Sequence, residues 1–394
     1  MTKHTPLCTL LLPVAFILTS CGPAEVADPP WKAAVDSLQN HYAPDSRLAV
    51  FRVTWKEQGD TVVVKGEVDN AKAKDEAIAA IRSRSVSEIV DSVVVLPDPK
   101  LGANGYGIVT VSVANVRSRP SHAGELSTQA LMGMVVKLLK KQRSWYYVQL
   151  PDDYLGWLPE RSMVITSSEG VDSWKAVRKV ITTSYFALIR KQPSGQASPV
   201  CDAVAGVLMR QGGRVGDWVA VELPDGRKGY VEQASVQEYE RWKRTRALTA
   251  QNIEKTATMF MGVPYLWGGT SPKGMDCSGF TKVVFRLNGL EIQRDADQQS
   301  HQGEAVETGN EFENLKKGDL LFFGDKRTET SEENVDHVGI YLGKKEFIHT
   351  PGGAWVKIDS FDPDAQNYNE LLRKIFLRAR RVIGTKQVPE VATK

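Results

Sequence analysis

The sequence predicts a multidomain α+β protein, and three observations support this prediction. The chain has 394 residues, more than one hydrophobic core usually holds, so about two to four domains are expected. A stretch in the middle of the chain recurs at an offset of 73 residues, with short alternating strands in each copy. The last third begins with helical patterns and continues with strand patterns, as α+β domains do.

Composition excludes several classes of protein. Hydrophobic residues make up 42% of the chain and charged residues 25%, which are ordinary globular values. The 50 basic residues nearly balance the 47 acidic ones, so no polyelectrolyte surface and no nucleic-acid partner are predicted.

The N-terminus has the pattern of an export signal. Residues 7–18 form an apolar run that is too short to span a bilayer. The run ends in Leu18-Thr-Ser-Cys-Gly22, which resembles the bacterial lipobox, where cleavage precedes a cysteine that carries lipid. We therefore expect residues 1–21 to hold the signal and lipobox, Cys21 to be lipidated, and the exported protein to contact membrane only through that lipid. A plain signal peptide with a fortuitous cysteine is the alternative.

The remaining cysteines do not suggest a disulfide framework. Cys8 would leave with the signal, so only Cys201 and Cys277 remain in the folded part. Their surroundings differ, and Cys201 is predicted to be a small buried hydrophobic residue.

Residues 31–98 are predicted to form a small α/β domain. Strand patterns at 48–53, 61–64 and 91–96 surround a helical pattern at 71–82. The pattern weakly resembles a BON-type domain. No side chains there converge on chemistry, so the domain is interpreted as a packing unit or a spacer without activity.

The internal repeat follows. Residues 145–158 align without gaps on 218–231, and 115–120 align on 188–193 at the same offset. Short strands separated by Gly, Pro and Asp turns resemble bacterial SH3-like β-barrels, predicted at 104–167 and 171–237. Such barrels bind cell wall or cover a neighbouring active site, and a purely structural role is the alternative.

Residues 245–383 are predicted to form the catalytic domain. A helical pattern at 249–261 is followed by a second one that Cys277 opens and that ends near Gly289. Five strand patterns then follow, and two of them carry His337 and His349.

A cysteine at the start of a helix suggests nucleophilic catalysis. The thiolate is the reactive form, and a helix N-terminus beside an imidazole lowers a thiol pKa. A base within hydrogen-bond reach and a third group that orients the base are also needed. Of the six histidines, only His337 and His349 lie in strand patterns near the predicted catalytic helix.

Five motifs in this region, in the same order, resemble the NlpC-type papain-like cysteine peptidases. The resemblance covers about residues 245–383. Its motifs are Pro264-Tyr-Leu-Trp-Gly-Gly, Asp276-Cys-Ser-Gly-Phe, Lys317-Gly-Asp-Leu-Leu-Phe-Phe, Asp336-His-Val-Gly-Ile-Tyr and Phe347-Ile-His.

The resemblance implies a set of catalytic residues. Cys277 is the nucleophile, His337 the general base and then acid, and His349 the residue that orients His337. Tyr265 helps to stabilise the oxyanion or hold the substrate. Zinc binding by the cysteine and the two histidines is a weaker alternative, and neither a metal nor a cofactor is expected.

It also implies hydrolysis of the γ-D-glutamyl bond to a diamino acid, either diaminopimelate or lysine, in murein peptides. Two SH3-like barrels before the peptidase resemble the recycling dipeptidases, which take stems with a free N-terminal L-alanine. Asp276 and Glu125 are then candidates to pair with the amine, with Tyr154 beside Glu125.

Ser278 and Asp295 would hold the D-glutamate. Two alternatives stay open, an endopeptidase on intact wall and a wall-binding lipoprotein without catalysis. The protein is expected to be a monomer that faces the periplasm or the cell surface.

Overall fold

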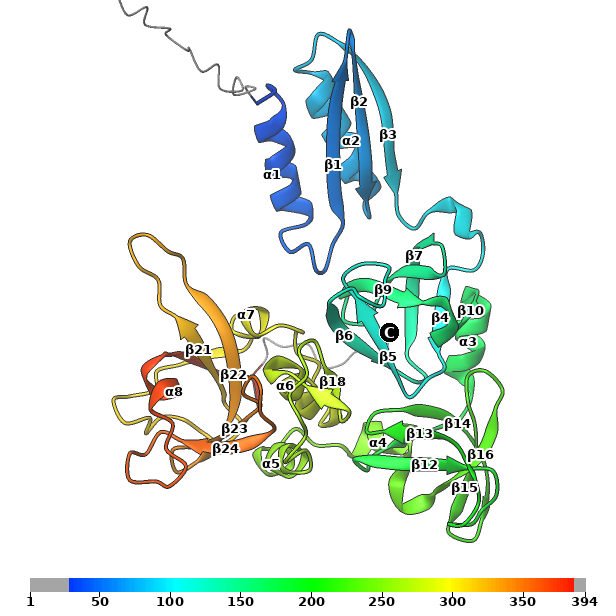
Figure 1. Cartoon of the computed structure of the whole chain (residues 1–394), viewed down its shortest axis with the longest axis vertical. Coiled ribbons are helices and arrows are strands. Elements are labelled where there is room, and N and C mark those ends of the chain that lie inside the picture. The colour runs from blue at the N-terminus through cyan, green and yellow to red at the C-terminus, as the bar shows by residue number, and fades with distance from the viewer. Residues whose placement is uncertain (1–27, 386–394) are drawn as a thin grey trace, which may run out of the picture.

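The computed structural model describes residues 28–385, so the predicted signal and lipobox lie outside the described residues. It confirms the predicted α+β class: a small N-terminal unit, two β-barrels and a C-terminal α+β unit follow one another along the chain (Figure 1). Within the described range, no helix combines the length and the hydropathy needed to cross a bilayer.

The N-terminal unit pairs two helices with one three-stranded sheet. Its elements are α1 (Lys32–Tyr42), β1 (Phe51–Gln58), β2 (Thr61–Val68), α2 (Ala71–Arg82) and β3 (Glu88–Val95). β1 and β2 are antiparallel, and α2 crosses over so that β3 runs parallel to β2. Asn70 caps α2 by accepting the amide hydrogens of Lys72 and Ala73, which explains why this helix begins where the sequence pattern predicts.

The N-terminal unit is docked on the first barrel through a shared apolar cluster, which also includes Leu155 and Trp157. Val50 and Leu96 of the unit pack against Leu139, Trp145 and Tyr147 of the barrel, and all are nearly inaccessible to solvent. Because burying apolar side chains is the main driving force for association, the unit is fixed to the barrel rather than tethered.

The two barrels have the same strand order, and each strand of the second begins 73 residues after its counterpart. The first contains β4 (Tyr106–Val109), β5 (Val113–Arg117), β6 (Leu126–Leu131), β7 (Val135–Gln142), β8 (Trp145–Gln149), β9 (Leu155–Pro159) and β10 (Met163–Thr166). The second contains β11 (Lys179–Thr182), β12 (Phe186–Arg190), β13 (Pro199–Val204), β14 (Leu208–Val215), β15 (Trp218–Glu222), β16 (Lys228–Glu232) and β17 (Val236–Glu238). A helix follows each barrel, α3 (Ser168–Ala176) and α4 (Tyr239–Thr245).

The barrels also share part of a core. Leu131 and Met132 of the first barrel belong to the buried cluster of the second, and the Leu208 amide donates to the Met132 carbonyl at 3.0 Å.

In the C-terminal unit, three helices precede a six-stranded antiparallel sheet, and a fourth, short helix lies before its last strand in the chain. The helices are α5 (Ala250–Thr258), α6 (Cys277–Leu287), α7 (Ala296–Gln299) and α8 (Glu370–Lys374), and a small hairpin, β18 (Thr270–Ser271) and β19 (Gly274–Met275), precedes α6. The sheet order is β20 (Glu304–Val306), β25 (Phe376–Arg381), β21 (Leu320–Asp325), β22 (Asn334–Gly343), β23 (Glu346–His349) and β24 (Lys357–Ser360). Phe280 and Val284 of α6 pack on Phe322 and Ile340, so the sheet fixes the helix that Cys277 begins.

Candidate active site

Cys277 is the first residue of α6 and is 7% exposed. Asp276 caps the helix by accepting the Gly279 amide hydrogen at 2.7 Å. A side chain at Gly279 would meet the Gly269 carbonyl oxygen at 2.0 Å, so only glycine lets the helix start pack this closely against the preceding loop. The cap and the glycine therefore fix the sulfur at a helix N-terminus.

The thiol faces the strand that carries His337. Cys277 Sγ lies 3.8 Å from the Asp336 carbonyl oxygen, and the backbone of Val338 also interacts with the thiol. Asp336 and Val338 flank His337 on β22, so the thiol of the predicted nucleophile lies against the backbone on either side of the predicted base.

His337 is held by a relay of side chains. Its Nε2 lies 2.7 Å from Nδ1 of His349, and Nε2 of His349 lies 3.0 Å from Oδ2 of Asp359. Asn369 and Lys357 also bind the Asp359 carboxylate, at 2.6 and 2.9 Å. Burial opposes ionisation of Asp359, but its hydrogen-bond donors outweigh that effect and hold the pKa of this carboxyl below its usual range.

An ionised Asp359 fixes both histidine tautomers. A carboxylate only accepts hydrogen bonds, so His349 must carry its proton on Nε2 and accept through Nδ1. His337 must then donate from Nε2, which leaves Nδ1 as its free lone pair. The relay thus prepares the nitrogen that is not bound to His349 to accept a proton.

The sequence interpretation missed Asp359 and Asn369. A signal for Asp359 existed, since it lies on the strand after the one that carries His349, and β24 pairs with β23 in register. No sequence motif tied Asn369 to the site, because it reaches the carboxylate from a separate loop before α8.

The expectation of a lowered thiol pKa is wrong for Cys277. Burial, and then the Asp276 carboxylate, raise the pKa of Cys277 to about 12. Burial, and then the neighbouring His349, lower the pKa of His337 to about 3. Desolvation outweighs the helix N-terminus, so thiol and imidazole are both neutral at physiological pH.

Tyr265 lies beside the same centre. Its backbone amide donates to the Ala354 carbonyl at 2.7 Å, which holds the 264–267 segment against the sheet domain. Burial, then the proximity of Cys277 and Asp276, raise the pKa of Tyr265, so the phenol keeps its proton and can donate a hydrogen bond.

Asp276 is fully engaged inside the protein. Its oxygens accept from both terminal nitrogens of buried Arg294, at 3.1 and 2.6 Å, and from the amides of Gly268 and Gly279. Ser278 joins the group, because its hydroxyl accepts from Arg294 at 2.9 Å. Asp276 therefore has little capacity left to bind a substrate amine, and the sequence interpretation did not foresee its pairing with Arg294.

The first barrel reaches the C-terminal unit through the loop between β8 and β9. Asp152 forms a buried ion pair with Lys282 of α6 at 3.0 Å. Two residues further on, the Tyr154 hydroxyl donates to Oδ2 of Asp295 at 3.0 Å. The structure thus brings Tyr154 and Asp295 together, at the start of α7.

Glu125 comes from a second loop of the first barrel and is exposed. It accepts a hydrogen bond from Nε1 of Trp267 at 2.6 Å, and Trp267 itself is 62% exposed. The loop therefore contacts the segment that holds Tyr265, but no bond joins Glu125 to Tyr154 or Asp295 in the described residues.

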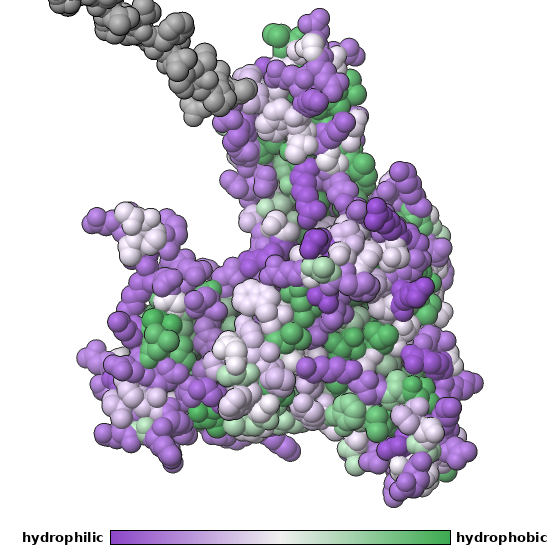
Figure 2. All heavy atoms as spheres, viewed as in Figure 1, coloured by the Kyte–Doolittle hydropathy of each residue, from purple (hydrophilic) through white to green (hydrophobic). Residues whose placement is uncertain are grey.

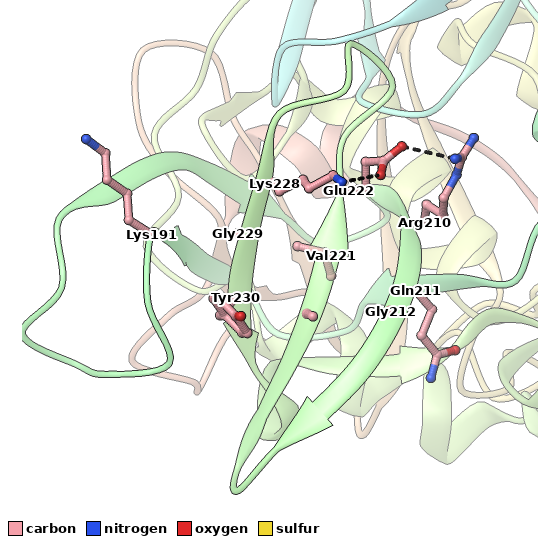
Figure 3. A pocket seen from close by; sticks show the side chains of 10 residues that line it. Lys191, Arg210, Gln211, Gly212, Val221, Glu222, Lys228, Gly229 and Tyr230 are labelled. Carbon is pink, nitrogen blue, oxygen red and sulfur yellow. Dashed lines mark hydrogen bonds and ion pairs between the residues drawn. The ribbon is translucent and has the colours of Figure 1, made fainter.

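A surface hollow of about 440 Å³ lies elsewhere, on the second barrel (Figure 3). Figure 3 shows Glu222 between Arg210 and Lys228, and none of the residues that line the hollow is a cysteine or histidine. It therefore offers no nucleophile and base. Cys201, half-buried in the same barrel, has a pKa raised to about 11 by burial.

The comparisons with known proteins agree with this geometry. Residues 262–373 match the NlpC/P60 family, and residues 116–163 match the bacterial dipeptidyl-peptidase Sh3 domain. The chain is 31% identical over 243 residues to the γ-D-glutamyl-L-lysine dipeptidyl-peptidase of Bacillus cereus, covering 59% of this chain and 69% of that protein.

Two further similarities extend over more of the known protein. Dipeptidyl-peptidase 6 of Lysinibacillus sphaericus is 28% identical over 277 residues, 67% of this chain and 94% of the relative. The crystal structure of an NlpC/P60 family protein from Bacillus cereus superposes with a TM-score of 0.60 and 26% identity, covering 71% of this chain and 99% of that one. The chain therefore belongs to the NlpC/P60 family of cysteine peptidases.

Proposed function

We propose that this protein is a murein dipeptidyl-peptidase that hydrolyses the γ-D-glutamyl–diamino acid bond of stems with a free N-terminal L-alanine. The observation that carries the proposal is a helix-start thiol that lies against the strand of a histidine whose tautomer is fixed. The carboxylate of Asp295, which Tyr154 of the first barrel contacts, adds the proposed amine end. Relatives named as dipeptidyl-peptidases support the same substrate class.

In the proposed reaction, Cys277 Sγ attacks the γ-carbonyl carbon of D-glutamate while His337 Nδ1 takes the thiol proton. The backbone N–H of Cys277 and the Tyr265 hydroxyl bind the oxyanion that forms. The C–N bond then breaks, and His337 returns its proton to the departing amine of the diamino acid.

A thioester remains, and water completes the cycle. His337 takes a proton from the attacking water, the C–S bond breaks, and the Cys277 thiolate recovers that proton. His349 and Asp359 stabilise the imidazolium in both steps, because the ionised carboxylate stands at the end of the relay.

At the amine end, we assign the substrate ammonium to Asp295 and Tyr154 rather than to Asp276. Asp295 is 24% exposed at its side chain and therefore accessible, whereas Arg294 and two amides occupy Asp276. Glu125 lies at the edge of the proposed site, and Ser278 remains the proposed contact for D-glutamate.

The test is to incubate the signal-free protein with L-Ala-γ-D-Glu-meso-diaminopimelate and with its N-acetylated form, and to identify the products by mass spectrometry. Cleavage of the free-amine peptide alone supports the dipeptidase. Equal cleavage of both peptides would favour an endopeptidase on polymeric wall. Cleavage of neither, with Cys277→Ala as the blank, would leave a wall-binding protein.

We also propose that the protein acts outside the cytoplasm as a monomer anchored through lipid on Cys21. A relative from Escherichia coli that is named as a murein DD-endopeptidase supports an extracytoplasmic site. Mass spectrometry of the membrane-extracted protein tests the anchor, since Cys21→Ala should abolish the lipid adduct. Light scattering of the soluble form tests the monomer.

A further inference from the structure

The N-terminal unit reaches the proposed amine end with a single arginine. Arg47 lies in the loop between α1 and β1, and Figure 1 shows this loop pointing toward α7 and the first barrel. Its Nη1 donates to Oδ2 of Asp295 and to Oδ1 of Asp297, both at 3.0 Å. Its Nη2 donates to Oδ2 of Asp297 at 2.7 Å.

The guanidinium is itself held from both sides. Asp45 of the same loop accepts from Nε and Nη2 of Arg47, at 2.9 and 2.8 Å, and also binds Gln298 of α7 at 2.6 Å. The Arg47 carbonyl accepts the Leu155 amide hydrogen at 2.8 Å, next to Tyr154. This backbone hydrogen bond fixes the position of Arg47 relative to Tyr154, and both side chains contact the same oxygen of Asp295.

We infer that Arg47 is a positioning residue for the substrate amine, contributed by the N-terminal unit, and that it orients Asp295 so that its other oxygen meets the free ammonium. The inference rests on the proposed function. Arg47 and Tyr154 both bind Oδ2, and neither binds Oδ1, which lies 3.8 Å from Nη1 of Arg294. Arg47 is bidentate to Asp297 and makes one charge-assisted bond to Asp295. A charge-assisted bond fixes a carboxylate more firmly than a neutral donor does.

The charges around this point favour a cation. Three carboxylates, those of Asp45, Asp295 and Asp297, surround the one guanidinium of Arg47. The other nearby guanidinium, Arg294, is paired with Asp276. The cluster therefore keeps an excess of negative charge, which attracts a substrate ammonium. An acylated N-terminus carries no charge and lacks this attraction. On the face that Figure 2 shows, the neck between the N-terminal unit and the rest of the molecule consists mainly of hydrophilic residues.

Arg47 also supports ionisation of Asp295. Burial raises the pKa of Asp295, Arg294 and Arg47 oppose that rise, and Tyr154 and Asp297 are the other titratable groups that face it. Without Arg47, the pKa of Asp295 would rise further, and a protonated carboxyl would bind ammonium poorly.

The experiment compares Arg47→Met and Arg47→Lys with wild type on L-Ala-γ-D-Glu-meso-diaminopimelate, using the full mature chain. We expect Arg47→Met to raise KM about tenfold, as loss of a charge-assisted contact does, with kcat within about twofold. The acid limb of kcat/KM should move to higher pH, and Arg47→Lys should recover part of the loss. The lysine variant also keeps a cation in the loop, should the methionine variant fold poorly.

Arg52→Met is the matched control. Arg52 comes from β1 of the same unit and contacts the Tyr147 hydroxyl of the first barrel at 2.9 Å, so it tests docking without touching Asp295. Its kinetics should equal those of wild type. An unchanged KM in Arg47→Met would overturn the inference. A lower KM would also overturn it, because Arg47 would then block the access of the substrate amine to Asp295. An equal loss in Arg52→Met would reduce the role to docking.

The two proposals fail in different ways. A wild-type protein that shows no preference for the free amine overturns the proposed function and this inference with it. A clear wild-type preference that Arg47→Met leaves intact overturns this inference alone.

Discussion

At the scale of single residues, Asp359 decides the chemistry of a histidine it never touches. It accepts from Nε2 of His349, and that contact fixes which nitrogen of His337 is free. Asp359→Asn should therefore lower kcat/KM by about 100-fold or more, the lower range of general acid–base catalysis. Steady-state kinetics measure the effect. Asp364→Asn, the same change on an exposed turn, should be silent, and equal activity of both variants would remove Asp359 from the relay.

The buried thiol gives a second prediction at this scale. With the pKa of Cys277 raised to about 12, the reactive thiolate is scarce at neutral pH and increases as pH rises. The rate of alkylation by iodoacetamide should therefore rise about tenfold per pH unit above neutrality. Mass spectrometry can follow the modification, with Cys277→Ala to subtract any reaction at Cys201. A rate that is already at its plateau near neutral pH would indicate a thiolate–imidazolium pair instead.

Sequence patterns located the main candidate residues but not their partners. Cys277 was recognisable because it opens an apolar helix, and His337 and His349 because they lie in strand patterns. The partners of these residues were not recognisable from the sequence. Asp359, Arg294 and Arg47 come from distant segments that approach the site only in the folded chain. Burial likewise reversed the expected shift of the thiol pKa, and no one-dimensional pattern reports burial of one atom.

At the scale of elements, the ion pair between Lys282 and Asp152 fastens the first barrel to α6. The side chains are 6% and 11% exposed, so removing the lysine leaves the Asp152 carboxylate buried without its cation. Glu291, the second ion-pair partner of Lys282, loses its cation as well. Lys282→Met should cost about 3–5 kcal/mol of stability. Lys317→Met is the control, because its pair with Glu254 is about one-third exposed and should cost less than about 1 kcal/mol.

Thermal melting of both variants measures the difference. A similar small change in the two would mean that the barrel loop is held by other contacts. Because Tyr154 follows Asp152 in that loop, Lys282→Met should also weaken the use of free-amine substrates, which the peptide assay can measure.

Elements were more predictable than their contacts. The helix at 71–82 and the helix that begins at Cys277 were placed correctly, since a cap and a 3.6-residue apolar period mark both. The sequence pattern does not identify helix α1, and it predicts for residues 31–98 a packing unit or a spacer without activity. That interpretation missed the loop after α1, whose arginine meets Asp295, because contacts between domains leave no periodic trace in a sequence.

At the scale of the whole molecule, the N-terminal unit covers apolar surface of the first barrel. Deleting residues 1–98 would expose Leu139, Trp145 and Tyr147, which are at most 7% exposed in the full chain. The truncated protein should melt at a lower temperature, bind a hydrophobic dye and associate. Size-exclusion chromatography and dye fluorescence measure this. A monodisperse, non-binding product with unchanged melting would show that the interface contributes little.

The core shared by the barrels limits how this protein could be rearranged by recombination. The duplicated segments look like interchangeable modules, yet Leu131 and Met132 complete the interior of the following copy. Exchanging or deleting one copy would remove buried side chains from the core of the other copy. It would also remove the backbone hydrogen bond between Leu208 and Met132. The two copies therefore form one structural unit, and substitutions at their seam are expected to occur in compensating pairs.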